Sequence, residues 1–213
     1  MDNKTVYILG VGHSTPVSID ISLDCGFQIG GLYHYNDTRT GEFVNGYQII
    51  GSFDDLWKKD IHGMQFVLSM GDNSIRANLL SKLLERGGYV PTMIHPKANV
   101  SRFAEISQIG VVIPAFCDIQ PNTKIEQNVM LGSSVLIGHN THIGENSFIA
   151  CHSAVGAYIS IGKNVFMGLN STCISGKVDY IGDNAVIGAG CVVNKSVETN
   201  VVMIGNPCSV LHK

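Results

Sequence analysis

From residue 94 to residue 193, an apolar residue returns at almost every sixth position, a period that fits neither an α-helix nor an ordinary strand. Repeats of six residues are typical of a parallel β-helix, in which three short strands make one coil. The apolar positions are Ile94, Val100, Ile106, Val112, Ile119, Ile125, Leu131, Ile137, Ile143, Ile149, Val155, Ile161, Met167, Cys173, Ile181, Ile187 and Val193. We therefore predict about six coils over residues 94–204.

The repeat also predicts which side chains point inward and which residues form the corners. The apolar side chain points inward and stacks on its equivalents in adjacent coils, which lie roughly 4.8 Å apart and are joined by parallel hydrogen bonds. Small residues often follow it, and we expect glycine and asparagine at the corners because both tolerate unusual backbone angles. The longer steps before Ile119 and Ile181 predict insertions that bulge out at corners. The period does not fix the hand of the coil.

Residues 1–92 follow a different pattern, in which apolar runs alternate with helical segments. Runs at 5–10, 27–37, 47–51, 64–72 and 89–96 predict strands, and residues 73–88 predict an amphipathic helix. Ser52 followed by Asp55 predicts a capping box at the start of another helix. The alternation favours a small, Rossmann-like parallel sheet. We therefore predict two domains, residues 1–92 and residues 93–213.

Composition narrows the function classes. The chain has 213 residues, 15% of them charged, and a net charge of −3, so charge gives no case for binding nucleic acid or an anionic membrane. No apolar run approaches the roughly 20 residues that a membrane span needs. The first residues lack the features of a signal peptide, so we expect a cytoplasmic protein. The six cysteines show no metal-binding spacing, so we expect buried free thiols and no metal site.

Several segments together resemble a known family. The stretch AVIGAGCVVNKSV, followed by NVVMIGNPCSVL, resembles the final coil and tail of hexapeptide-repeat acyltransferases. The segments YILGVGH, MGDNSIRANLL and IHPKANVS resemble the first strand and turn, a second strand–helix unit and the linker of the sialic acid O-acetyltransferase family. That family includes bacterial N-acetyltransferases of nucleotide-linked 4-amino-4,6-dideoxy sugars. The resemblance implies a left-handed β-helix, acetyl-CoA as co-substrate and a homotrimer.

His139 is the candidate general base. It stands two positions after the inward Ile137, so we expect it on the outer surface of the coil. A histidine can accept a proton near neutral pH. The resemblance implies the same role, but the family has an acidic residue where this chain has Asn140. A family asparagine before the histidine and a second family histidine after it are also replaced, by the Gly132-Ser133 region and by Phe148.

The resemblance also implies where the nucleotide sugar binds. The turn Gly10-Val11-Gly12 is half of a dinucleotide-binding fingerprint, which is weak evidence taken alone. By resemblance, this turn, the loop after the second strand and a later strand–helix turn hold the substrate. His142 is a further candidate for the acceptor site. The substrate-binding candidates are Gly10, Gly12, His13, Ser14, Asn36, Asp37, Gly71, Asp72, Asn73, Arg76 and His142.

Acetyl-CoA is expected in a groove between two β-helices of the trimer, held largely by backbone groups. The candidates for contact with it are Gly156, Ala157, Gly168, Leu169, Ile174, Lys177 and Lys195. The function that this indicates is N-acetylation of a nucleotide-linked 4-amino-4,6-dideoxyhexose for bacterial surface glycans. Two alternatives stay open. One is O-acetylation of a sugar such as a sialic acid, and the other is a non-catalytic β-helix trimer that binds a partner.

Overall fold

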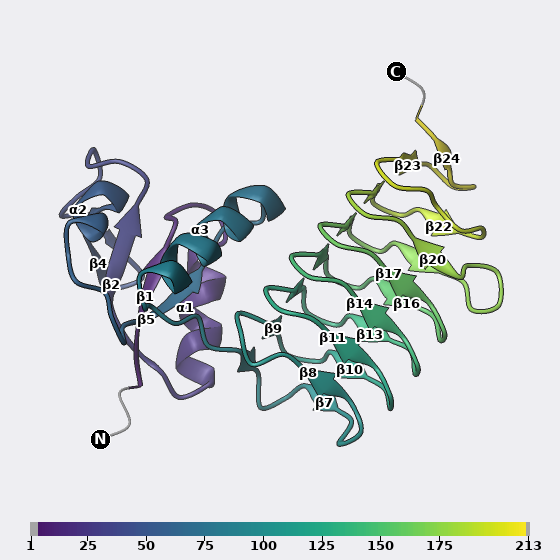
Figure 1. The fold of residues 1–213 in the computed structure, drawn as a ribbon, viewed down its shortest axis with the longest axis horizontal. Coiled ribbons are helices and arrows are strands. Elements are labelled where there is room, and N and C mark those ends of the chain that lie inside the picture. Colours follow the sequence, from purple (N-terminus) through teal and green to yellow (C-terminus); the bar gives the residue numbers. More distant parts are fainter. Residues whose placement is uncertain (1–3, 212–213) are drawn as a thin grey trace. The chain divides into compact units, whose positions relative to one another are not determined.

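A computed structural model of the protein describes residues 4–211. The chain divides into two compact units, residues 1–93 and residues 94–213. In Figure 1 the first unit holds the helices and a sheet, and the second consists of stacked coils.

The first unit is an α/β sheet. Its strands follow the order β3-β4-β2-β1-β5, and every neighbouring pair is parallel except β3 with β4. The strands are β1 (Thr5–Leu9), β2 (Gln28–His34), β3 (Phe43–Val44), β4 (Tyr47–Ser52) and β5 (Gln65–Leu68). The helices are α1 (Thr15–Asp24), α2 (Phe53–Trp57) and α3 (Asn73–Glu85). The predicted Rossmann-like parallel sheet is therefore confirmed.

Side-chain caps begin two of these helices. Ser52 and Asp55 form the predicted capping box on α2, and the Ser52 N–H holds the pKa of the Asp55 carboxyl at about 2. Asp72 caps α3 by accepting a hydrogen bond from the Ile75 N–H. Both caps satisfy backbone N–H groups that have no partner inside their own helix.

Two features of the first unit differ from the prediction. Helix α1 is not signalled by its apolar pattern because its buried side includes Thr15, Ser18 and Ser22 beside only two isoleucines. The run at 89–96 is not a strand of this sheet. Tyr89 makes only an isolated bridge with Gln65, and Met93–Ile94 is the first strand of the β-helix.

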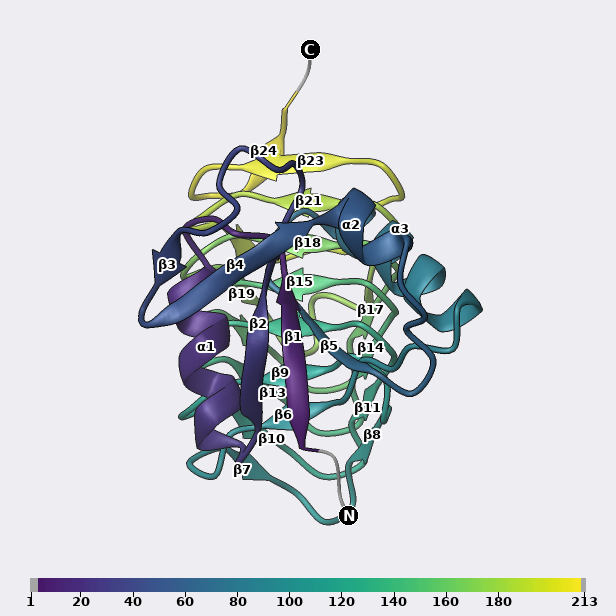
Figure 2. The same ribbon diagram turned by 90° about the vertical axis from the view of Figure 1, so that its left-hand side faces the viewer.

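The second unit is a parallel β-helix with three faces. Face 1 is the sheet β22-β19-β16-β13-β10-β7, and face 2 is β20-β17-β14-β11-β8. Face 3 is β24-β23-β21-β18-β15-β12-β9-β6, whose strands lie one above another in Figure 2. The strands are β6 (Met93–Ile94), β7 (Asn99–Val100), β8 (Glu105–Ile106), β9 (Val112–Ile113), β10 (Asp118–Ile119), β11 (Lys124–Ile125), β12 (Met130–Leu131), β13 (Leu136–Ile137), β14 (His142–Ile143), β15 (Phe148–Ile149), β16 (Ala154–Val155), β17 (Ser160–Ile161), β18 (Phe166–Met167), β19 (Thr172–Cys173), β20 (Tyr180–Ile181), β21 (Val186–Ile187), β22 (Val192–Val193), β23 (Val202–Ile204) and β24 (Ser209–Val210).

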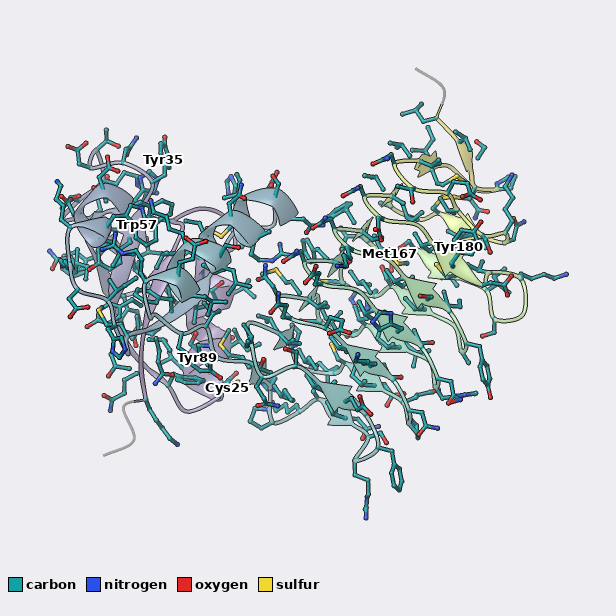
Figure 3. All side chains as sticks on the ribbon, in the orientation of Figure 1. Cys25, Tyr35, Trp57, Tyr89, Met167 and Tyr180 are labelled. Carbon is teal, nitrogen blue, oxygen red and sulfur yellow. A yellow bond between two sulfur atoms is a disulfide. The ribbon has the colours of Figure 1, made fainter. Side chains whose placement is uncertain are left out.

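The second residue of most of these strands fills the interior. Ile137 pairs with Ile119 and Val155 in the coils on either side, and all three are at most 1% exposed. Met167, labelled in Figure 3, is likewise fully buried. The side chains therefore stack in columns, as the six-residue period predicts, and they form the hydrophobic core of this unit.

One inward position was predicted wrongly. Ile113 is fully buried, whereas Val112 is half-buried and pairs with Met130, a residue in the outward position of its strand. The seven-residue step therefore lies before Ile113, not after Val112. The residues Val111-Val112-Ile113 are all apolar, so the period alone could not decide between them.

The corners of the β-helix need both left-handed backbone and close approach between coils. Asn140, Asn146 and Asn164 adopt the left-handed conformation, with φ values of 55°, 63° and 56°. Gly144 does not have a positive φ, but a Cβ added there would lie 2.6 Å from the carbonyl carbon of Gly162 in the next coil. The expected tolerance of unusual backbone angles is therefore confirmed for asparagine and for glycines such as Gly190, with a φ of 69°, whereas Gly144 allows two coils to approach closely.

Replacing Gly144 by alanine should therefore lower the free energy of unfolding by about 1–3 kcal/mol, because backbone rather than a movable side chain opposes the new methyl group. Denaturant unfolding of the purified protein measures this. Gly12 is the matched control, since a Cβ added there meets no atom within 4 Å. If Gly144→Ala were as stable as Gly12→Ala, close approach of the coils would not explain the glycine.

The cysteine prediction is wrong for two residues. Cys191, at the last corner after face 3, and Cys208, in the tail, form a disulfide with their Cα atoms 5.3 Å apart. Their sequence separation of 17 residues carries no recognisable pattern, and only the return of the tail along β23 and β24 brings them together. The other four cysteines are free thiols, of which Cys117 and Cys173 are buried as predicted and Cys25 and Cys151 are only partly buried.

Candidate active site

The loops at the carboxyl edge of the first unit's sheet carry most of the predicted nucleotide-binding residues. β1 lies between β2 and β5, and the chain leaves it first toward β2 and later returns to β5 on its other side. In open parallel sheets, ligands bind at such a switch point, outside the carboxyl ends of the strands. The loops after β1, β2 and β5 contain Gly10 to Ser14, Asn36-Asp37 and Gly71-Asp72, and Asn73 is the first residue of α3.

The turn after β1 is tight and packs against the end of β2 and the loop after β5. Gly10 has a φ of +91°, and its N–H donates to the Tyr33 carbonyl at 2.9 Å. A Cβ at Gly10 would lie 2.7 Å from Cε of Met70 in the loop after β5. The Gly12 N–H donates to Thr15 Oγ1 at 2.8 Å, while His13 and Ser14 are exposed. The structure therefore brings the turn next to the ends of both flanking strands.

Asn36 and Asp37 lie at the end of β2 and differ in their surroundings. The Asn36 side-chain oxygen accepts hydrogen bonds from Thr38 Oγ1 at 2.7 Å and from the Thr38 N–H at 3.3 Å. It also lies 3.0 Å from His34 Nδ1. Asn36 therefore organises its own loop, whereas the Asp37 side chain is exposed.

Arg76 is 1% exposed and does not point into solvent. Its guanidinium donates to Asn73 Oδ1 at 3.0 Å and to the Met70 carbonyl at 3.4 Å. Burial lowers the pKa of Arg76 to about 10, and the nearby Asp72 carboxylate opposes that shift, so the side chain stays cationic near neutral pH. The structure gives Arg76 the role of holding the loop of Gly71, Asp72 and Asn73.

His139 lies in the second unit, on the corner between faces 1 and 2, and its side chain is exposed as predicted. Its backbone N–H donates to Gln120 Oε1 at 3.1 Å. Its ring meets the Tyr158 ring edge-on, with centroids 5.1 Å apart. Neighbouring coils thus hold this histidine from both sides.

Gln120 and Tyr158 were not among the site residues predicted from the sequence. They are separated from His139 by 19 residues in either direction, close to the 18-residue length of one coil. That spacing is the signal that could have found them.

An amide, rather than a carboxylate, contacts the imidazole. Asn140 Nδ2 lies 3.4 Å from His139 Nδ1, and Asn140 Oδ1 accepts a hydrogen bond from Asn122 Nδ2 at 3.0 Å. A neutral amide can orient the ring but adds no negative charge beside it. The site therefore offers an exposed imidazole, able to accept a proton, with polar support from two coils.

His142 lies on face 2 beside an acidic group. Its Nε2 is 3.2 Å from Glu126 Oε1, which also accepts a bond from Lys124 Nζ at 2.8 Å. The hydrogen bond from Lys124, followed by that from His142, lowers the pKa of the Glu126 carboxyl. This pair borders a cleft of about 400 Å³. The cleft is lined by Glu126, His142, Gly144, Glu145, Ser160, Ile161, Gly162, Lys163 and Asp183.

The predicted acetyl-CoA contacts fall on two corners. Gly156, Ala157, Ile174, Lys177 and Lys195 follow strands of face 1, on the same corner as His139. Tyr158 donates its N–H to the His139 carbonyl at 3.1 Å, and the Ala157 N–H donates to Ser175 Oγ at 2.8 Å, so successive coils continue this edge.

Gly168 and Leu169 follow β18 of face 3 and lie on another corner. Gly132 and Phe148 also belong to that corner and to face 3. One β-helix therefore does not bring these residues to His139.

The helices among residues 4–211 are all too short or too polar to cross a membrane. Within the same residues, no group of three or more histidine, cysteine or acidic side chains is arranged to hold a metal ion.

Family models match both units of the chain. Residues 5–83 match the PglD N-terminal domain, and residues 122–151 and 158–195 match the hexapeptide repeat of succinyl-transferase. The second match agrees with the resemblance of the coils to hexapeptide-repeat acyltransferases. The PglD-type N-terminal domain agrees with the family resemblance found in the sequence.

Solved structures share the fold over nearly the whole chain. A histidine variant of perosamine N-acetyltransferase from Caulobacter crescentus, solved with CoA and GDP-perosamine, has a TM-score of 0.88 and 25% identity, covering 98% of this chain and 97% of that chain. The acetyltransferase domain of PglB from Neisseria gonorrhoeae, solved with acetyl coenzyme A, has a TM-score of 0.88 and 23% identity, covering 98% and 100%. These structures confirm the predicted fold class, an α/β domain followed by a left-handed β-helix.

A curated relative matches only one part of the chain. Uncharacterized protein L142 of Acanthamoeba polyphaga mimivirus is 38% identical over 74 residues, which is 35% of this chain. The chain spans 14% of the length of that relative.

Proposed function

We propose that this protein is an acetyl-CoA-dependent N-acetyltransferase that acts on a nucleotide-linked 4-amino-4,6-dideoxyhexose. The observation that carries this proposal is the match, across both units, to an enzyme that N-acetylates a sugar and was solved with CoA and a GDP-linked sugar. The exposed His139, where the family resemblance expects the base, supports the same chemistry.

The nucleotide part of the substrate binds at the carboxyl edge of the first unit's sheet. The backbone of Gly10 and Gly12 approaches the diphosphate closely, and His13 and Ser14 are exposed beside it. Asp37 offers a carboxylate to the ribose hydroxyls, the role of the acidic residue near the second strand in related folds. Arg76 acts through the loop of Gly71, Asp72 and Asn73 rather than by direct contact.

Acetyl-CoA lies along the His139 corner. Gly156 and Ala157 line it one coil beyond the histidine, and the exposed side chains of Lys177 and Lys195 offer positive charge to the CoA phosphates. The predicted contacts at Gly168 and Leu169 require a second copy of the chain, whose face-3 corner forms the other wall of the groove. A homotrimer provides three such grooves.

The proposed reaction transfers the acetyl group from CoA to the sugar amine. The sugar amine attacks the thioester carbonyl, His139 accepts the proton that the amine loses, and CoA leaves as a thiolate that takes up a proton. General-base catalysis of this kind contributes roughly 10²–10⁴-fold to the rate. His142, held by Glu126, borders the acceptor side of the site. We place the reaction in the cytoplasm, in the synthesis of surface glycans.

A panel of acceptors tests the function. The full-length protein is incubated with acetyl-CoA and GDP-, UDP- or dTDP-linked 4-amino-4,6-dideoxyhexoses, each beside the matching 4-hydroxy sugar, and free thiol and product mass are followed. We expect thiol release only with amino sugars, and an amide product. Acetyl ester on the hydroxy sugars would instead indicate O-acetylation. Absence of thiol release with every acceptor would contradict the enzymatic function.

A further inference from the structure

Tyr35 lies at the edge of the sheet where the nucleotide is proposed to bind. It directly follows β2, and the preceding carbonyl of Tyr33 accepts a hydrogen bond from the Gly10 N–H at 2.9 Å. The end of β2 is thus joined to the turn after β1. Figure 3 labels Tyr35 in the first unit, where its side chain projects outward from the chain. Tyr35 therefore directly follows the strand end that adjoins the turn of the proposed phosphate site.

The ring of Tyr35 is braced although it is exposed. The side chain is 68% exposed, while its neighbour His34 is 4% exposed. The two ring centroids are 4.2 Å apart, with an interplanar angle of 46°. His34 is held in turn, since its Nδ1 lies 3.0 Å from Asn36 Oδ1. A ligand that stacks on Tyr35 would therefore contact a ring that already packs against the buried His34 ring.

Other exposed aromatic residues lack this combination. Phe103 and Phe116, both 66% exposed, lie at corners of the β-helix, and Phe43, 65% exposed, lies in the hairpin strand β3. Tyr158 is 68% exposed but packs against His139. Exposure alone is thus common in this chain, and Tyr35 is distinguished by its place beside the turn and its contact with a buried ring.

We propose that Tyr35 stacks on the base of the nucleotide substrate, and this inference rests on the proposed function. In doubly wound sheets the diphosphate binds at the first turn and the ribose near the end of the second strand. The base therefore extends past the end of β2, where Tyr35 stands. Every base has a π-face, so stacking favours both purines and pyrimidines.

Binding of nucleoside diphosphates, without any acetyl transfer, tests this role. Calorimetry compares GDP and UDP on the full-length wild type, Tyr35→Ala and Tyr35→Phe. We expect Tyr35→Ala to weaken GDP binding by about 10-fold or more, and Tyr35→Phe to bind within about 2-fold of the wild type. The loss should be larger for GDP, because guanine offers more stacking area than uracil. Phe43→Ala, which removes an equally exposed ring away from the turn, should bind as the wild type does.

The outcomes separate the inference from the proposed function. If the wild type binds neither GDP nor UDP, the proposed nucleotide-linked substrate is wrong, and the stacking role falls with it. If the wild type binds and Tyr35→Ala binds equally well, stacking is overturned and the proposed function is unaffected. If Tyr35→Phe loses as much affinity as Tyr35→Ala, the phenol hydroxyl, rather than the ring, makes the contact. Unchanged acetyl-CoA binding shows that each variant is folded.

Discussion

Replacing His139 by alanine is expected to lower the rate of acetyl transfer by about 10²-fold or more, the amount that a general base contributes. The side chain is exposed on the corner, so its loss should leave the β-helix intact. Steady-state kinetics with the best acceptor of the panel measures the effect. We expect kcat to fall while KM for acetyl-CoA changes little, because the missing group acts on the proton and not on CoA binding.

A second histidine provides the control for this measurement. His62 is exposed in the first unit, in the segment that leads into the amino end of β5, whereas the proposed substrate loop follows the carboxyl end of that strand. His62→Ala should retain the wild-type rate. A His139→Ala protein with wild-type kcat would remove this residue from the mechanism and would turn attention to His142 and its partner Glu126.

A substitution at Asn140 tests whether this residue contacts the imidazole of His139. Asn140→Asp places a carboxylate 3.4 Å or so from the imidazole, in the position of the Asn140 amide nitrogen. A carboxylate beside a histidine favours its charged form and raises its pKa. The acid limb of the pH–rate profile should therefore move to higher pH. An unmoved profile would mean that residue 140 does not contact the imidazole during the reaction.

Replacing Ile137 by alanine should lower the free energy of unfolding by about 2–5 kcal/mol, the range for such substitutions at fully buried positions. Ile137 is fully buried and stacks between Ile119 and Val155, so the deletion leaves a cavity that neighbouring coils cannot fill by moving separately. Chemical denaturation followed by circular dichroism measures the change. Ile137→Val should cost only about 0.5–1.5 kcal/mol, because it removes one methyl group.

The preceding residue of the same strand is the matched control. Leu136 points outward from β13 and is 37% exposed. Leu136→Ala should therefore cost clearly less than Ile137→Ala, although both remove part of an aliphatic side chain from one strand. Equal losses at the two positions would contradict the alternation of inward and outward side chains on which the β-helix depends.

Much of the candidate site follows from local patterns. The position of His139 two residues after an inward isoleucine was enough to predict that it lies on the outer surface. Each strand is short, so a residue two positions after the inward one already lies in the corner. The loop residues Gly10, Asp37 and Asp72 follow apolar strands, which places them at one edge of a parallel sheet. By contrast, Arg76 was predicted to contact the substrate, yet its side chain is buried and bonds to its own loop. Whether a charged side chain points in or out depends on the packing of its helix, which no local pattern contains.

The amino-acid sequence alone is enough to predict the β-helix, because a six-residue period repeated over many coils admits few other structures in which every apolar side chain is buried. It also determined the alternation of strands and helices in the first unit. Packing between coils settles that Ile113 rather than Val112 points inward and that Cys191 meets Cys208. Each of these depends on which residues of different coils become neighbours, and that is set by the accumulated register of the whole stack.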